Sequence, residues 1–248
     1  MLKHFFILCA ARACQIFPFL RRFNPDAFSR TRIAARYLAG DGIEIGALHN
    51  PLCLPRGARA KYVDRMSLAE LRRQYPEFKK KRLAAPDIID NGETLASVAN
   101  GSLDFVVASH FLEHCENPIL ALQNMIRVLR PNGVIYLVVP EKRATFDKDR
   151  PTTGFAHVER DYREGPAWSR RTAFEEYVRL VEKITDPEKA AERVNIYLQT
   201  SYSIHYHAWT EWEIMEMILF LKRRLNMDAC LELICNRRSE VIIILRKQ

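Results

Sequence analysis

Short apolar runs alternate along the chain with stretches whose apolar residues fall on one face of a helix. The runs have the length of buried strands and lie at residues 42–46, 60–64, 86–90, 103–109 and 134–140. Helices are expected between them, at residues 29–38, from 67 to about 75, and from 118 until residues 131–133 end the helix. Strands of this kind that alternate with helices predict a parallel sheet covered on both faces.

The pattern changes at the end of the chain. Thr210 and Glu213 have the spacing of a capping box, which predicts a helix that starts there. Two apolar runs, 230–235 and 241–245, then follow one another across a short polar turn, which predicts an antiparallel hairpin. The predicted fold class is therefore α/β: a doubly wound, Rossmann-like sheet of seven strands, mostly parallel, with an antiparallel hairpin at its C-terminal end.

A polar and aromatic segment, residues 141–209, separates the fifth strand from the last helix. Its twelve basic and twelve acidic residues balance, and helices are expected at about 170–183 and 187–197. Because open α/β sheets bind ligands beyond the carboxyl ends of their strands, this mainly helical insertion should cap that edge. The predicted organisation is a basic, apolar extension with a helix (1–38), a core (39–140), the cap insertion (141–209), and a helix and hairpin that complete the core (210–248).

The net charge of +8 is concentrated at the start of the chain. Residues 1–40 hold seven Lys and Arg against one acid, so the remainder is close to neutral. This argues against a nucleic-acid partner, which needs a basic surface across the domain. The apolar run within residues 1–25 is too short to span a bilayer as a helix. Three interpretations of this segment stay open: a helix docked on the domain, a peripheral membrane contact, or an export signal. Six scattered cysteines predict reduced thiols in the cytoplasm, where the protein could also lie at the membrane face.

The residues that end the predicted strands favour one kind of cofactor. Asp64 ends the second strand, where a carboxylate can accept hydrogen bonds from ribose hydroxyls. The first strand ends with Glu44 and Gly46, a single glycine preceded by a carboxylate. A pyrophosphate requires a glycine-rich loop, and the carboxylate would repel it, so an NAD(P)-dependent oxidoreductase is disfavoured. A cofactor with an amino group and no phosphates, such as S-adenosylmethionine (SAM), is favoured.

Taken in order, these residues resemble the motifs of the class I SAM-dependent methyltransferases, in particular those with a type 11 methyltransferase domain. The resemblance covers about 40–140, and 210–248 is similar to the family's last strands. It implies SAM as the cofactor and S-adenosylhomocysteine as the product. Where the family usually has three glycines, Ala47 and Leu48 follow Gly46, which leaves the contacts of the first loop open. The resemblance implies these cofactor-binding residues: Glu44, Gly46, Ala47, Asp64, Asp87, Ile88, Ser109, His110 and His114.

Residues 141–151 and 202–209 within the insertion resemble a subgroup that is associated with sugar and surface-polysaccharide assembly. This implies a sugar or glycan-linked acceptor. A different small molecule or a lipid-linked intermediate stays open as an alternative acceptor, because the basic N-terminus suits an anionic membrane face. A non-catalytic binding module on the same fold also stays open, since the first glycine loop is shortened.

Methyl transfer to a hydroxyl requires the acceptor oxygen in line with the leaving sulfur, and it benefits from a general base. His205 or His207 is predicted as that base, oriented by Asp147 or Asp149, since each pair would share a side in an extended segment. No metal ion is predicted. His110 and His114 do not match the zincin spacing, and a divalent-ion site made from His205, His207 and Asp149 is the less favoured alternative.

Overall fold

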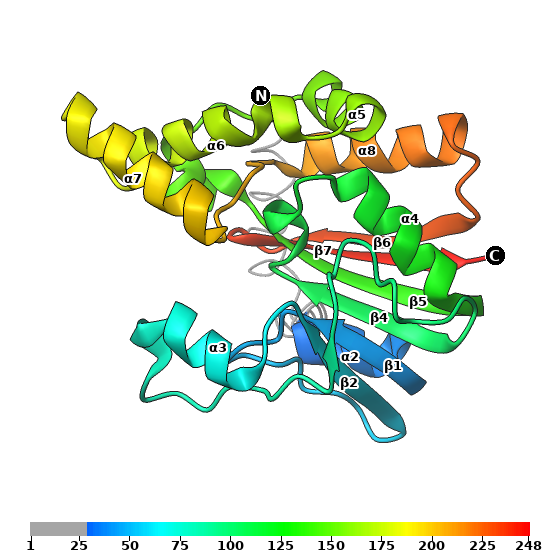
Figure 1. Ribbon diagram of the computed structural model, residues 1–248. Coiled ribbons are helices and arrows are strands. Elements are labelled where there is room, and N and C mark those ends of the chain that lie inside the picture. Colours follow the sequence, from blue (N-terminus) through cyan, green and yellow to red (C-terminus); the bar gives the residue numbers. More distant parts are fainter. Residues whose placement is uncertain (1–28) are drawn as a thin grey trace, which may run out of the picture.

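The computed structural model describes residues 29–248, and its centre is a seven-stranded sheet (Figure 1). The strand order is β3-β2-β1-β4-β5-β7-β6. Strands β1 to β5 pair in parallel, whereas β7 runs antiparallel to both β5 and β6. This topology confirms the predicted Rossmann-like fold class. The strands are β1 Gly40–Ile45, β2 Ala58–Asp64, β3 Ile88–Ile89, β4 Leu103–Ser109, β5 Leu129–Pro140, β6 Ala229–Asn236 and β7 Glu240–Lys247.

Helices cover both faces of this sheet, and Figure 1 shows α4 and α8 on one side with α2 on the other. Alternate residues of β4 reach the two cores, because side chains alternate along a strand. Val106 and Ala108 pack with α4 and α8, while Phe105 and Val107 pack with α2. The helices are α2 Arg30–Tyr37, α3 Leu68–Gln74, α4 Pro118–Val128, α5 Phe155–Glu164, α6 Ala167–Leu180, α7 Pro187–Thr200 and α8 Glu211–Arg224.

Capping side chains set the starts of several helices. Ser67 and Glu70 form the predicted capping box of α3, and Thr210 and Glu213 form that of α8. In each box the hydroxyl accepts a backbone N–H and the carboxylate reaches back to the N-cap, so two groups that lack helical partners are satisfied. The helix starts were therefore readable from the sequence.

Several boundaries differ from the sequence expectation, and those of β3 and α4 affect the region near the cavity. Strand β3 covers only Ile88–Ile89, although 86–90 was expected. Helix α4 ends at Val128, and Leu129 already has an extended backbone. Residues 131–133 therefore do not end the helix. They lie in an irregular part of β5, where the register jumps from the Leu103 pair to the Phe105 pair.

The insertion after β5 is mainly helical and contains α5, α6 and α7. Helices α6 and α7 pack against each other around a small separate core that includes Phe174, Val178 and Val194. The sequence predicted these two helices with shifted ends and did not predict α5. Figure 1 shows all three helices along one edge of the molecule, next to the segment that leads into α8.

The predictions made for the N-terminal segment 1–25, including a membrane contact, lie outside the described residues. Within residues 29–248, no helix has the length and apolar character needed to cross a bilayer. Four cysteines fall in this range, and each is a free thiol there: Cys53, Cys115, Cys230 and Cys235.

Candidate functional site

A cavity of about 630 Å³ lies beyond the carboxyl ends of the strands. Its walls come from the ends of β1 and β2, from the turns after β3 and β4, and from the insertion. This is where open α/β sheets bind ligands, and the volume is in the range of small-molecule sites. Of the predicted cofactor residues, four line it: Gly46, Asp64, His110 and His114.

Two glycines and one aromatic ring shape the floor of this cavity. Gly46 has a φ of 66°, a left-handed conformation that a residue without Cβ adopts readily. A Cβ on Gly92 would lie 2.5 Å from Ile45 Cγ2 and 2.6 Å from Phe111 Cζ, so only glycine fits under the ring without a shift. Both glycines line the cavity.

Asp64 is the predicted ribose acceptor, and its place agrees with that role. It ends β2, lines the cavity, and accepts a hydrogen bond from the Met66 backbone N–H at 3.3 Å. Burial raises the pKa of its carboxyl, while backbone hydrogen bonds and Arg65 act in the opposite direction. A ribose that donates two hydroxyls would compensate for this desolvation.

Glu44 does not line the cavity, although it was predicted to contact the cofactor. It points to the opposite face of β1 from Ile43 and Ile45, and its carboxylate accepts the Leu52 backbone N–H at 2.9 Å. Burial raises the pKa of Glu44 to about 7, against the hydrogen bond from Leu52 and the charge of Arg30. Its contact holds the loop after β1 in place.

Four more predicted cofactor residues lie outside the cavity wall: Ala47, Asp87, Ile88 and Ser109. Asp87 precedes β3, at the amino end of the strand, and its side chain accepts the Tyr62 backbone N–H at 2.8 Å. The residues after β3, Asn91 and Gly92, line the cavity instead. Asp87 and Ile88 were expected to contact the cofactor, and in the structure the cavity wall at this strand is formed by residues that follow it.

His205 is held by Asp147, as one of the predicted pairings required. The Nδ1 atom of His205 lies 2.6 Å from Asp147 Oδ2, and Arg150 donates to Asp147 Oδ1 at 2.8 Å. Arg150 also donates to the backbone carbonyl of His205 at 2.8 Å. Burial raises the pKa of Asp147, but hydrogen bonds from His205 and Arg150 outweigh it and lower the pKa. The imidazole is thus fixed through Nδ1, and its ring lines the cavity.

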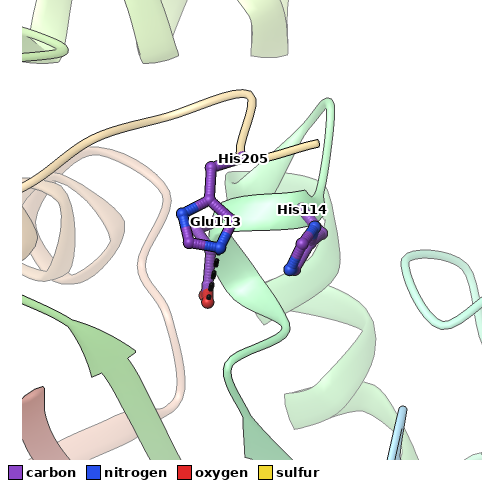
Figure 2. A group of neighbouring side chains, drawn as sticks. All are labelled: Glu113, His114 and His205. Atoms are coloured by element: carbon purple, nitrogen blue, oxygen red, sulfur yellow. Dashed lines mark ion pairs between the residues drawn. The ribbon is translucent and has the colours of Figure 1, made fainter. Parts of the chain in front are cut away.

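Glu113 and His114 lie next to this imidazole (Figure 2). Glu113 is fully buried, and neither carboxylate oxygen has a hydrogen-bond partner in the part of the chain that the structure describes. His205 Nε2 and His110 Nδ1 both lie 3.7 Å from Glu113 Oε1. Burial raises the pKa of Glu113, and the neighbouring histidines oppose that change.

His114 is held in the same manner as His205. Its Nδ1 lies 2.8 Å from the carbonyl oxygen of Ile204, which can only accept a hydrogen bond, so Nδ1 carries the proton. Burial, with a smaller effect from His205, lowers the pKa of His114 to about 3, which keeps the ring neutral. Glu113, His114 and His205 offer three ligand atoms within 4.8 Å of one another and could hold a metal ion.

His110 belongs to a charged group at the rim. Its backbone φ is 52°, and its Nε2 lies 2.9 Å from Arg30 Nη2. Arg30 forms an ion pair with Glu240, whose pKa is lowered to about 2 because hydrogen bonds from His110 and Arg30 outweigh the effect of burial. Arg30 Nη1 also donates to Ser109 Oγ at 3.2 Å, so the Ser109 hydroxyl is bound to this group of residues.

His207 and Asp149, the other two predicted catalytic residues, lie away from this cavity. His207 is buried, and its ring stacks on Trp209 with centroids 4.9 Å apart. Asp149 is exposed and pairs with Lys183 at 2.7 Å. The expectation of a shared side assumed a strand, but residues 202–209 form no strand, so alternation does not apply.

Several cavity residues were not singled out from the sequence. Glu113 and the 91–92 turn follow the carboxyl ends of β4 and β3, and that position was the available signal for both. The aromatic side chains contributed by the insertion and α3 had no local signal: Tyr75, Phe146, Tyr177, Tyr202 and Tyr206.

Residues 46–137 match the methyltransferase domain family. The match runs from the loop after β1 into β5, so it contains the sheet edge that forms the cavity floor. It indicates a methyltransferase and supports SAM as the cofactor. A comparison with curated protein sequences gave no match.

Solved structures with a similar fold include several methyltransferases. A SAM-dependent methyltransferase from Methanosarcina mazei has 18% identity and a TM-score of 0.46, with 87% of this chain and 96% of that chain covered. One from Aquifex aeolicus has 8% identity and a TM-score of 0.47, with 91% of this chain and 94% of that chain covered. The CurJ carbon methyltransferase has 11% identity and a TM-score of 0.44, covering 85% of this chain and 49% of that chain. Similarity at this level says nothing about the acceptor.

Proposed function

We propose that this protein transfers the methyl group of SAM to a hydroxyl of a sugar or glycan-linked acceptor. One observation carries the proposal: a single cavity joins Asp64, at the end of β2, to an imidazole that Asp147 orients. The carboxylate of Asp64 suits the binding of a ribose, and the imidazole of His205 suits the role of a general base. The supporting finding is the methyltransferase domain match over residues 46–137.

The cofactor half of the site would use the sheet edge. Asp64 would accept the ribose hydroxyls, and the backbone at Gly46 and Gly92 would let the ligand approach closely. Glu44 acts indirectly, since its carboxylate holds the loop after β1 through Leu52. No phosphate has to be accommodated, which suits a loop with few glycines.

The acceptor half would use the insertion, whose aromatic rings gather at the cavity. Phe146 packs against His205 with ring centroids 4.6 Å apart, and Tyr177 lies edge-on to Phe146. Aromatic faces beside charged groups such as Arg65 and Glu93 suit a sugar, which has both apolar C–H faces and hydroxyls. A lipid-linked or other small acceptor would use the same wall.

In the proposed step the acceptor oxygen attacks the methyl carbon while the carbon–sulfur bond breaks. The bonding electrons stay on sulfur, so S-adenosylhomocysteine leaves neutral, and the hydroxyl proton passes to Nε2 of His205. Asp147 accepts the Nδ1–H and stabilises the imidazolium that forms, a role that a carboxylate next to histidine performs in other general-base systems.

A second version of the same transfer uses a divalent metal ion. Its specific support is Glu113, a buried carboxylate whose two oxygens find no hydrogen-bond donor among residues 29–248. His114 and His205 are each anchored through Nδ1, the arrangement that prepares Nε2 for a metal. Such an ion would polarise the acceptor hydroxyl, and His205 would then be a ligand instead of the base.

The test combines cofactor binding with transfer of a labelled methyl group. Calorimetry with SAM and S-adenosylhomocysteine establishes the cofactor, and labelled SAM with a panel of sugars and glycan-linked lipids then reports the acceptor. The His205→Ala variant should bind SAM as the wild type does and lose transfer. Full transfer by this variant would remove the proposed base. SAM binding without transfer to any member of a broad panel favours the binding-module alternative.

A further inference from the structure

A second group of metal-ligating side chains lies in the insertion, outside the cavity. Helix α5 carries His157 and Asp161 one turn apart, and His207 comes from the segment that leads to α8. We call these three residues the cap cluster. None of the three lines the large cavity.

Three ligand atoms converge in the cap cluster. His157 Nε2 lies 3.2 Å from Asp161 Oδ2, and His207 Nε2 lies 4.0 Å from the same oxygen. All three atoms lie within 4.8 Å of one another. Donors around a tetrahedral Zn²⁺, bound at about 2.0–2.2 Å, are separated by about 3.4 Å. The observed spacing therefore needs only a small closure to surround such an ion.

The cluster contains buried polar atoms that lack a well-formed hydrogen bond. Asp161 and His207 are 0% and 2% exposed. Within the described range 29–248, Asp161 Oδ2 and both ring nitrogens of His207 make no well-formed hydrogen bond, and the contact of the His207 ring with the Glu116 backbone has poor geometry. A buried donor or acceptor without a good hydrogen bond is destabilising, so this arrangement favours a bound ligand.

The residue types of the cluster suit a cation. Imidazole nitrogens are common ligands of divalent transition metals. Asp161 supplies the negative charge that a buried cation requires.

The surroundings hold each ligand in position. Ser169 Oγ donates to Asp161 Oδ1 at 2.9 Å, which leaves Oδ2 directed at the histidines. Trp209 stacks on the ring of His207, and Trp168 lies 4.8 Å from the ring of His157. A cavity of about 10 Å³ between these groups has room for one ion or one water.

We propose that the cap cluster binds one transition metal ion of the Zn²⁺ type, through two imidazoles and one carboxylate. This donor set is common to zinc and to other divalent metals. His157 is 35% exposed on its side chain, so a water can complete the coordination from the solvent side. Arg170, which also lines the small cavity, is neutralised by Glu116 at 2.9 Å.

The bound ion would join parts of the insertion that are distant in sequence. His207 is two residues from His205, so an ion between α5 and His207 would fix the segment that carries the proposed base. Asn117 also connects α4 to α5, because its side-chain amide donates a hydrogen bond to the backbone carbonyl of Asp161 at 3.1 Å. The ion has a structural role and does not touch the reacting atoms.

The experiment measures Zn²⁺ binding to the full chain without SAM, so its outcome is independent of the proposed function. Protein freed of metal by a chelator is titrated with Zn²⁺ in a Glu113→Gln background, which disables the other candidate cluster. Cobalt replacement gives an absorption signature of nitrogen and oxygen ligands. We expect one ion per chain, a higher melting temperature on loading, and binding weakened about tenfold or more by a further His157→Gln change.

Two results would overturn the site. One is the absence of Zn²⁺ binding by folded Glu113→Gln protein. The other is equal Zn²⁺ affinity with and without His157→Gln, a change at a half-exposed position that should leave the fold intact. Asp161→Asn provides an independent variant, since an amide can keep the Ser169 hydrogen bond while removing the charge.

Discussion

Asp147 and His205 are 58 residues apart in the chain and meet at 2.6 Å, with the carboxylate on the Nδ1 side of the ring. This contact decides which of the two predicted histidines faces the cavity. It also fixes the tautomer, because a carboxylate on Nδ1 keeps the proton there and leaves the lone pair on Nε2. The proposed base therefore depends on a positioning residue from the turn after β5.

Replacement of Asp147 should therefore affect transfer and spare cofactor binding. Asp147→Asn is expected to lower kcat by about 10²–10⁴, the usual contribution of general-base catalysis, because the amide does not stabilise the imidazolium. Labelled methyl transfer and SAM calorimetry measure the two effects separately. Asp149→Asn is the matched control, since Asp149 is exposed and pairs with Lys183, and its kcat should equal that of the wild type. Equal losses in both variants would contradict the assignment.

The role of a metal in the transfer can be tested where the cap cluster is disabled. In the His157→Gln variant, Glu113, His114 and His205 form the remaining candidate cluster of residues 29–248. If His205 is the base, transfer by this variant should be unchanged by EDTA. Loss of transfer with EDTA, restored by added Mg²⁺ or Zn²⁺, would instead assign His205 as a metal ligand.

Glu44 should make the stability of the fold depend on pH. Its pKa is raised from 4.5 to about 7 in the folded protein, so the folded state binds the proton more tightly than the unfolded state. The tighter proton binding adds roughly 3 kcal/mol to the free energy of unfolding below pH 4.5. This added stability is lost as the pH rises from 4.5 to 7. Urea unfolding of the wild type and Glu44→Gln at several pH values isolates it. A constant difference between the two proteins across this window would contradict the raised pKa.

A methyl group at Gly92 should disturb the cavity floor. Gly92→Ala places a Cβ 2.5 Å from Ile45 Cγ2 and 2.6 Å from Phe111 Cζ, which is closer than these atoms can approach. We expect a loss of about 1–3 kcal/mol in unfolding free energy, typical of overpacking, and weaker SAM binding. Gly154→Ala is the control, because a Cβ there meets nothing within 4 Å among the described residues. A melting temperature of Gly92→Ala equal to that of the control would contradict the packing argument.

Much of the fold was predictable because its physical signals are local. The apolar run 103–109 is buried at its centre, as its sequence predicts, and capping boxes such as that of Ser67 mark helix starts. Helix α5 was missed because its sequence is mostly polar and its single buried face includes Val158 and Asp161. The burial of an aspartate next to histidines follows from tertiary packing, which no local pattern records.

The candidate site was predictable only in part. Asp64 ends a recognisable strand, so its place at the sheet edge followed from topology. Asp87 was expected beside the cofactor, but it precedes β3 and lies outside the cavity wall, because the apolar run 86–90 does not show where the two-residue strand begins and ends. For the base, the sequence left two histidines and two aspartates open. Only the folding of the insertion over the sheet selects His205 and Asp147.

Calorimetric titration with SAM is the experiment on which the proposed function depends most. We expect the wild type to bind one SAM per chain, and Asp64→Ala to weaken binding about tenfold or more through loss of charged hydrogen bonds to the ribose. Asp87→Ala should bind as the wild type does, because Asp87 does not line the cavity. Folded wild-type protein that binds neither SAM nor S-adenosylhomocysteine would contradict the account.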